Sequence, residues 1–386
     1  MASAPASTIP LARTPEEWAV EMARLKERAF HGKQIFKWIH QRGVTDAAAM
    51  TDLPATLRAK LAEEGLRSVL DVVTERRALD DTRKLLVALG DGANVETVLI
   101  PRLPKSDTED ADAAAVVEDE DELDADAAGS APVHVTQCIS TQVGCAMGCV
   151  FCASGVAGLK RHMRPDEIVA QVLVGRSRLD EREQLRNVVL MGMGEPLHNY
   201  DATVRALRLL THKDGIGLSP RKVTVSTSGL VPEIAKLGED FAGQIGLAIS
   251  LHAADDETRT RLMPINKKYP LAKLMEGLRA YPLPKRRKIT IEYTLVAGKN
   301  DAVDEARKLA RLLTGLPVKI NLIPMNPIEA STLGPTSMNG VHAFQRVLTD
   351  AGYACFIRKR RGDDVSAACG QLALLGAKPK VRVNRD

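Results

Sequence analysis

The chain is poor in aromatic side chains, with six Phe, five Tyr and two Trp among 386 residues. Its core must therefore be aliphatic, and with 45% hydrophobic residues the composition is sufficient for a large one. So few rings also argue against nucleic-acid binding mainly through base stacking. The length predicts one large domain with a smaller one attached.

The sequence also lacks long apolar runs. No stretch approaches the roughly 20 apolar residues of a membrane-spanning helix, and MASAPASTIPLARTPEEW resembles no signal peptide. We therefore expect a cytoplasmic protein that does not associate with membranes. Cysteines are few, but four of the six fall within 15 residues, which favours metal or redox chemistry over structural disulfides.

Basic residues are absent from residues 107–126, which contain eleven acids. Setting these aside changes the net charge from +4 to +15 for the rest of the chain. Such a charge is typical of a protein that binds a polyanion, although a scattered, solvated basic surface is the alternative. The acidic stretch has no aromatics or periodicity, so we expect residues 105–132 to form a disordered insertion.

Two small units are expected before this insertion. Residues 1–65 are predicted to form a basic helical domain, because apolar side chains recur at helical spacing from residue 15 to 64. Residues 66–104 are predicted to form a small β extension of short strands, with a turn at Asp91 and Gly92.

Residues 133–360 alternate apolar strands with helical segments, and residues 361–386 form a C-terminal segment with a basic tail. This alternation predicts an α/β fold with a parallel sheet, either a (β/α)6 barrel or a doubly wound open sheet. In a barrel, functional residues collect at the carboxyl ends of the strands. The predicted strands are 133–140, 187–194, 222–229, 244–252, 288–296 and 318–324.

A cysteine cluster follows the first of these strands. Cys145, Cys149 and Cys152 form a C-x3-C-x2-C loop, and thiolates suit iron–sulfur clusters or zinc. Three local thiolates can hold one corner of a cubane cluster and leave its fourth iron open. The alternative is a zinc site completed by Cys138 or a histidine, but zinc motifs usually contain C-x2-C pairs separated by a longer loop.

This three-cysteine spacing is the signature of the radical S-adenosylmethionine (SAM) superfamily. From residue 20 onward the chain resembles more closely the RlmN family of bacterial dual-specificity RNA adenine methyltransferases. The resemblance implies a radical SAM partial (β/α)6 barrel with a small N-terminal helical accessory domain that binds RNA. It is carried by HGKQIFKWIH, VETVLIP, CISTQVGCAMGCVFCASG, GMGEPLHN, VTVSTSG, AISLHA, IPMNP and RGDDVSAACGQL.

The resemblance implies two cofactors, a 4Fe-4S cluster on the three cysteines and SAM, of which two molecules are used per turnover. Phe151 is expected to shield the adenine of SAM. Polar residues at strand ends are expected to bind SAM, with a carboxylate for its amino group and a glycine that allows close backbone approach. The predicted SAM contacts are Gly194, Glu195, Ser226, Ser250, Leu251, His252 and Asn326.

The resemblance also implies a catalytic route through the protein itself. Cys369 accepts a methyl group from one SAM, and a radical generated from a second SAM activates this group for addition to carbon 2 of adenine. Cys138 then attacks Cys369, and the resulting disulfide releases the RNA. Glu96 is the predicted base that removes the proton from carbon 2. No role maps onto Cys355, which we expect to be structural.

The implied partners are 23S rRNA and tRNA, together with an electron donor such as flavodoxin or ferredoxin, and we expect a monomer. Basic clusters at 285–288, at 358–361 and in the tail are expected to contact phosphates. One alternative is methylation of adenine at carbon 8, as in the antibiotic-resistance relatives. Another is a noncatalytic RNA-binding protein with structural zinc.

The acidic insertion departs from the family, which joins the strands of Glu96 and Cys138 much more briefly. We predict that this insertion mimics RNA and reduces nonspecific binding. Deleting residues 105–130 should then increase RNA affinity and steepen its dependence on salt, because more phosphate contacts become available. Titrations at several salt concentrations test this, and an unchanged affinity and salt slope would refute it.

Overall fold

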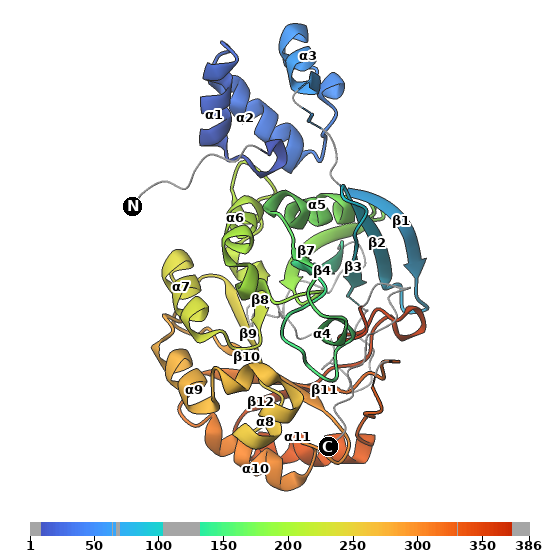
Figure 1. The fold of residues 1–386 in the computed structure, drawn as a ribbon, viewed down its shortest axis with the longest axis vertical. Helices are drawn as coiled ribbons and strands as arrows, with labels where there is room; N and C mark the ends of the chain where they lie inside the picture. Colours follow the sequence, from blue (N-terminus) through green and yellow to red (C-terminus); the bar gives the residue numbers. More distant parts are fainter. Residues whose placement is uncertain (1–8, 64, 67–69, 103–131, 330, 373–386) are drawn as a thin grey trace.

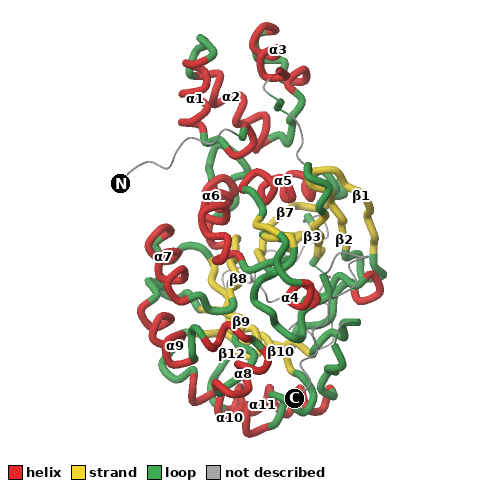
Figure 2. The backbone as a smooth tube through the Cα atoms, viewed as in Figure 1, coloured by secondary structure: helices red, strands yellow, loops and turns green. Residues whose placement is uncertain are grey.

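The computed structural model describes residues 9–63, 65–66, 70–102, 132–329 and 331–372 (Figure 1). Residues 105–131, expected as a disordered insertion, and the basic tail from 373 therefore lie outside the described residues. The described residues build a ten-stranded sheet in the order β1-β2-β3-β4-β7-β8-β9-β10-β11-β12. Figure 2 shows these strands in the middle of the molecule, with most helices on their outer side.

The N-terminal residues form the predicted helical unit. The first helix begins after Thr14, whose side chain accepts a hydrogen bond from the Glu17 N–H, while the Glu17 side chain accepts one from the Thr14 N–H. The side chain of Trp18 is fully buried. The elements are η1 (Pro10–Ala12), α1 (Pro15–Arg24), α2 (Phe30–Phe36), the π-helical turn η2 (Lys37–Gln41), η3 (Ala47–Ala49) and α3 (Ala55–Glu63).

The β extension is a meander of β1 (Leu70–Arg77), β2 (Arg83–Leu89) and β3 (Asn94–Pro101). All pairs in it are antiparallel, and the predicted turn at Gly92 closes β2 onto β3. The extension continues the main sheet, because β3 pairs antiparallel with β4 (Val133–Cys138) and places Val98 opposite Cys138. The two strands that carry the predicted base and resolving cysteine are therefore neighbours.

The remaining strands are parallel and follow one another in chain order, namely β4, β7 (Glu183–Leu190), β8 (Val223–Thr227), β9 (Gly246–Ser250), β10 (Ile289–Leu295), β11 (Val318–Pro324) and β12 (Ala354–Ile357). A doubly wound sheet would reverse this order at a switch point. The sheet does not reverse, which confirms the barrel-type alternative.

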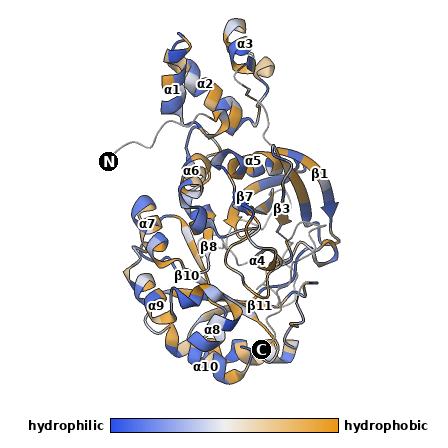
Figure 3. Cartoon of the chain, in the orientation of Figure 1, coloured by the Kyte–Doolittle hydropathy of each residue, from blue (hydrophilic) through white to orange (hydrophobic). Residues whose placement is uncertain are grey.

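Helices cover the outer side of the parallel strands (Figure 1). Apolar residues line the strands, and β10 is buried along its whole length (Figure 3). No helix in the described parts of the chain is long and apolar enough to cross a membrane. The helices are α5 (Pro165–Arg176), α6 (Tyr200–Thr211), α7 (Val231–Phe241), α8 (Asp256–Leu262), α9 (Leu271–Ala280), α10 (Val303–Leu312) and α11 (Met338–Asp350).

Several short elements were not expected from the sequence. The hairpin of β5 (Gln142–Val143) and β6 (Arg161–His162) closes the base of the cysteine loop, and α4 (Ala153–Ala157) follows the third cysteine. Short helical turns follow several strands or helices and begin with proline. They are η6 (Pro196–Asn199), η7 (Pro220–Lys222) and η8 (Pro264–Lys267), while η9 (Asp363–Val365) lies in the C-terminal segment.

Arg176, at the end of α5, connects the helical unit to the barrel. Its guanidinium donates to the carbonyls of His40 and Gln41, each at 2.9 Å. Arg176→Ala should lower the free energy of unfolding by about 1–3 kcal/mol, because two charged hydrogen bonds that join the helical unit to the barrel are lost, one of them part-buried. Urea denaturation measures this. Arg208→Ala, which breaks only an exposed pair with Asp240, should cost less than about 1 kcal/mol, and equal costs would contradict the assigned role.

Candidate active site

A pocket with about 920 Å³ of empty space, including its open mouth, lies at the carboxyl ends of the parallel strands. This is the position at which barrel folds place their chemistry. The pocket brings together Cys145, Cys149 and Cys152 with most of the predicted SAM contacts, namely Gly194, Glu195, Ser226, Ser250, His252 and Asn326.

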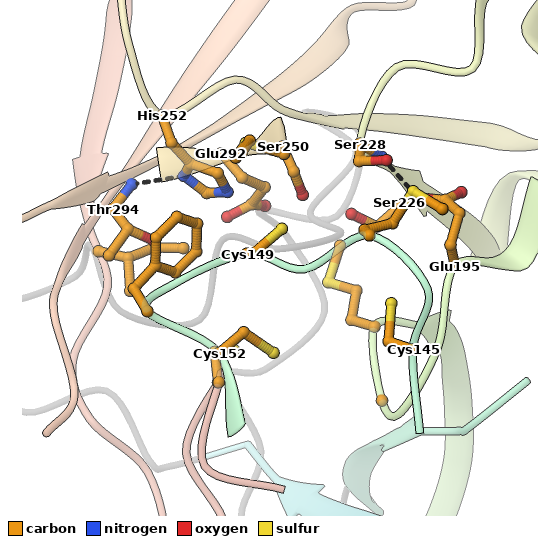
Figure 4. Close-up of a pocket in the computed structure, with 18 of the residues that line it drawn as sticks. Cys145, Cys149, Cys152, Glu195, Ser226, Ser228, Ser250, His252, Glu292 and Thr294 are labelled. Carbon is orange, nitrogen blue, oxygen red and sulfur yellow. Dashed lines mark hydrogen bonds between the residues drawn. The ribbon is translucent and has the colours of Figure 1, made fainter. Parts of the chain in front are cut away.

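The three cysteines point from one loop toward a shared space (Figure 4). Glycines allow the loop to fold this tightly. Gly144 has a φ of +78°, and a Cβ there would lie 1.9 Å from the Gly158 carbonyl oxygen, while a Cβ at Gly155 would lie 2.9 Å from the Cys149 backbone. Any larger residue at these two positions would displace the loop that presents the thiols.

The donor set fits a 4Fe-4S cluster. Burial raises the pKa of all three thiols, that of Cys145 to about 12, so their thiolate form needs a strong positive charge nearby, such as iron. Within the described ranges no three His, Cys, Asp or Glu side chains are arranged around a single ion. A cubane does not require this, because each thiolate binds a different iron atom.

Gly194 and Glu195 form the turn after β7. Gly194 has a φ of +105°, and a Cβ would lie 2.5 Å from the Gln142 side chain. The buried Glu195 carboxylate accepts from the N–H groups of Ser228 at 2.7 Å and Leu197 at 3.1 Å. Burial raises the pKa of Glu195, and these hydrogen bonds oppose that rise. The turn thus holds a carboxylate at the pocket wall, as a site for an ammonium group requires.

Two uncharged side chains at the wall, those of Ser228 and Asn326, have a polar atom without a hydrogen-bond partner within the described structure. The Ser228 hydroxyl makes no hydrogen bond of normal geometry although it lies beside Glu195, and the Asn326 side-chain oxygen is also unpaired. Both residues are buried and line the pocket. Buried polar atoms rarely remain unpaired, so these two fit a polar ligand such as SAM.

His252 forms one end of the pocket together with Phe151. Its φ is +57°, its Nδ1 accepts a hydrogen bond from the Thr294 N–H at 2.8 Å, and its proton is therefore on Nε2. Burial lowers the pKa of His252 to about 3, so the ring is neutral. The Phe151 ring packs against it edge-on at 4.8 Å, which is compatible with the predicted shield for adenine.

Leu251 is the predicted SAM contact that does not line the pocket. Its side chain is fully buried in the core, its N–H donates to the Glu292 carbonyl, and its carbonyl accepts from Arg259. The pocket is also lined by polar residues that were not predicted as SAM contacts, among them Ser228, Glu292 and Arg358. An acid inside the apolar run ITIEYTL was the available sequence signal for Glu292.

Glu96 lies outside this pocket. It is buried on β3 and forms an ion pair with Lys84 at 3.0 Å, and Lys84 also donates to the Ser366 carbonyl at 3.1 Å. The pair connects Glu96 to the C-terminal segment three residues before Cys369.

Cys369 is exposed and lines two adjoining pockets, the one described above and a second of about 390 Å³. Asn326 donates to the Cys369 carbonyl at 2.9 Å. Cys138 is buried at the end of β4, where burial and then the nearby Cys369 thiol raise its pKa to about 12. All six cysteines are free thiols, and the predicted pair lies close enough for one charge to affect the other.

Part of the basic run after β12 forms hydrogen bonds within the protein. Arg358 to Arg361 all line the second pocket. However, Arg361 donates to Asp80 and to the Pro101 carbonyl, and Arg360 donates to the Met325 carbonyl. Arg361 therefore fastens the C-terminal segment to the β extension, in addition to any phosphate contact.

Known proteins share this arrangement over nearly the whole chain. A "Dual-specificity RNA methyltransferase RlmN" of Sorangium cellulosum is 69% identical over 97% of each chain. The protein of the same name from Geobacter sulfurreducens is 45% identical over 90% of this chain and 86% of its own length. This chain belongs to the RlmN family.

Family models and a solved structure agree with this RlmN membership. The radical SAM superfamily model matches residues 139–313, and the model of the ribosomal RNA large subunit methyltransferase N-terminal domain matches residues 16–65. The crystal structure of a radical SAM methyltransferase from Sphaerobacter thermophilus superposes with a TM-score of 0.82 at 39% identity, covering 94% of this chain and 98% of its own.

RlmN membership confirms the predicted family, the radical SAM fold and the enzyme class, a radical SAM RNA methyltransferase. It also confirms the two predicted cofactors, the 4Fe-4S cluster and SAM. The noncatalytic zinc protein is thereby excluded. The roles of individual residues remain predictions. The geometry of the pocket shows which side chains lie together, so that each role can be tested by substitution.

Ser228→Ala should raise the Kd for SAM about threefold to tenfold, because it removes a hydroxyl that has no internal partner. The stability of the protein without SAM should not change, since no internal hydrogen bond is lost. Anaerobic calorimetry measures the affinity. The control is Ser177→Ala, which removes a hydroxyl that donates only to the Val174 carbonyl. An unchanged SAM affinity in Ser228→Ala would show that Ser228 does not contact SAM.

Proposed function

We propose that this chain methylates carbon 2 of adenine in 23S rRNA and tRNA, with Cys369 as the carrier of the methyl group. One observation carries the proposal: Cys369 lines both the pocket that holds the cysteine cluster and the adjoining pocket with the basic rim. A side chain shared by two pockets can accept a group on one side and deliver it on the other.

The first pocket is the donor side. Cys145, Cys149 and Cys152 would hold the cluster, and Glu195 and Asn326 would bind the amino acid part of SAM. When bound, the cluster supplies the electron that cleaves SAM to a 5′-deoxyadenosyl radical. The largely apolar enclosure formed by Phe151 and its neighbours excludes water, which protects a reactive intermediate.

The second pocket is the acceptor side. Ile100 and Ala367 supply apolar surface for a base, while Arg358 and Lys359 supply charge for the flanking phosphates. A base taken out of its stack would lie between this apolar surface and the basic side chains. The helical unit of residues 16–65, matched by the family's N-terminal model, would extend this RNA surface.

Two further groups complete the reaction. Glu96, which forms an ion pair with Lys84, is proposed to take the proton from carbon 2 of the adduct. Cys138 is proposed to attack Cys369, so that a disulfide forms while the bond between carrier and product breaks. Its raised pKa keeps Cys138 as a thiol until proton transfer activates it, which protects the carrier from early attack.

The proposal also includes an electron donor and an oligomeric state, which similarity to known proteins does not identify. A one-electron donor such as flavodoxin or ferredoxin is expected to reduce the cluster, and the enzyme is expected to act as a cytoplasmic monomer. The relatives' shared name, dual-specificity RNA methyltransferase, supports two RNA substrates, and we assign 23S rRNA and tRNA to this chain.

Anaerobic incubation with SAM, a reductant and unmodified RNA should yield 2-methyladenosine, detected by nucleoside mass spectrometry. Cys369→Ala should abolish the product entirely because the carrier is lost. Cys138→Ala should instead accumulate a covalent protein–RNA adduct, visible by gel electrophoresis, because nothing releases the product.

Cys355→Ala is the matched control. Cys355 is also a buried thiol at a strand of the same sheet, but it lies on β12 outside both pockets, so this variant should keep its activity. Methylation of carbon 2 by Cys369→Ala would refute the carrier role. Formation of 8-methyladenosine by the unmodified chain would replace the proposed regiochemistry with the carbon-8 alternative.

A further inference from the structure

The turn between β1 and β2 carries an exposed apolar side chain at its tip. Leu79 is 96% exposed, more than any other large apolar side chain in the described parts of the chain, the next being Val20 at 65%. The neighbouring Ala78 is buried, so the turn buries one of its two apolar side chains and exposes the other. Single exposed apolar residues are common on protein surfaces, so the rigidity and the position of the turn decide whether this leucine has a role.

Hydrogen bonds within the turn make it rigid. The Ala78 N–H donates to the Thr82 carbonyl at 2.8 Å, and the Asp81 N–H donates to the Ala78 carbonyl at 3.1 Å. The Thr82 N–H in turn donates to the Asp80 carboxylate at 3.0 Å. A rigid turn loses little conformational entropy when its tip binds another molecule, so a contact made by the tip side chain would retain most of its favourable free energy.

The turn is also attached to the C-terminal segment, which lies beside the end of β1 in Figure 1. The Leu79 N–H itself donates to the Asp364 carboxylate at 3.2 Å. The Asp80 carboxylate accepts from the Arg361 guanidinium at 2.7 Å. Arg361 lines the second pocket, as does Cys369. The residue next to Leu79 is therefore in direct contact with the rim of the proposed acceptor pocket.

The chemistry around the turn suits RNA. Asp80 forms an ion pair with Arg361 at 2.7 Å. Asp81 forms one with Arg77 at 3.0 Å, so both carboxylates repel a phosphate less than unpaired ones would. A base that is taken out of its stack leaves a gap, and proteins that unstack bases frequently insert an apolar side chain such as leucine between the neighbouring bases. The leucine at the tip has the apolar surface and the rigid support that this role requires.

We propose that Leu79 is an RNA-binding residue that enters the base stack of the substrate and fills the gap left by the target adenine. The contact is favourable because it removes the apolar surface of the leucine from water. The inference rests on the proposed function, since it requires that an adenine leaves its stack to reach the second pocket. It does not depend on which carbon of the adenine is methylated.

Removal of a base from its stack can be measured without methylation. The fluorescent adenine analogue 2-aminopurine is quenched in a base stack and brightens when it leaves the stack. Fragments of 23S rRNA and tRNA, each with 2-aminopurine in place of one loop adenine, are titrated with the cluster-loaded protein under anaerobic conditions. The unmodified protein should brighten one position, and Leu79→Ala should reduce this increase at least about fivefold, because the gap is no longer filled.

Two variants separate the proposed contact from general effects. Leu79→Met keeps an apolar side chain of similar volume, so it should retain most of the fluorescence increase. Met338→Ala shortens another exposed apolar side chain, on α11 and outside both pockets, and should leave the increase unchanged. Thermal unfolding should be the same in Leu79→Ala and the unmodified protein, because the leucine side chain is exposed.

An equal increase in Leu79→Ala and the unmodified protein would overturn the inference, and so would the absence of any increase with the unmodified protein. If Leu79→Ala changes only the sedimentation of the protein, the leucine is a contact between copies of the chain and the inference is again wrong. Formation of 2-methyladenosine in unmodified RNA is measured separately. If it forms while the fluorescence does not depend on Leu79, the proposed function stands without this inference. If the fluorescence depends on Leu79 but no 2-methyladenosine forms, the proposed function fails and this inference stands.

Discussion

The geometry of the active site depends on the contact between the C-terminal segment and the cysteine loop that follows the first barrel strand. The Ala153 N–H donates to the Gly370 carbonyl at 2.8 Å, and the Ser154 hydroxyl donates to the Leu372 carbonyl at 2.6 Å. Both donors belong to α4, directly after the third cluster cysteine. The loop that presents the thiols therefore also fixes the segment that presents Cys369, although more than 200 residues separate them.

Charged side chains of the β extension also hold the C-terminal segment in place. Lys84 pairs with Glu96 and also holds the Ser366 carbonyl, and Arg361 holds Asp80. Buried ion pairs are weak sources of stability, because desolvation offsets most of the Coulomb attraction. The buried pair of Lys84 and Glu96 does impose one geometry, since breaking it would leave an uncompensated buried charge, while the half-buried pair of Arg361 and Asp80 adds a second attachment. The β extension thus acts as a rigid support for the carrier segment, and the predicted base occupies a position within that support.

Sequence reasoning succeeded where a local pattern has a single physical meaning. Alternating apolar strands and helices predicted the parallel sheet, and the spacing of Cys145, Cys149 and Cys152 predicted that their side chains face one site, which the structure shows as a shared pocket. It was less informative where the interaction partner is main chain. Nothing in the sequence marks the acceptors of Arg259, which are mostly carbonyls, and counting charges cannot distinguish Arg361, which fastens two segments, from a residue free to bind phosphate. The hairpin of β5 and β6 has two residues per strand, too few for any periodicity.

The two sets of cysteines have different proposed roles within one site. The cysteines proposed as cluster ligands would bind iron as thiolates, which the positive charge of iron would favour although burial raises their pKa. Burial and the nearby Cys369 thiol raise the pKa of Cys138 to about 12, so the resolving role proposed for Cys138 would require removal of its proton. Cys369 is exposed between two pockets, where it can exchange its group on either side. Formation of a disulfide between Cys138 and Cys369 requires a leaving group on one of the two sulfur atoms, and in the proposed reaction this is the methylated product carried by Cys369.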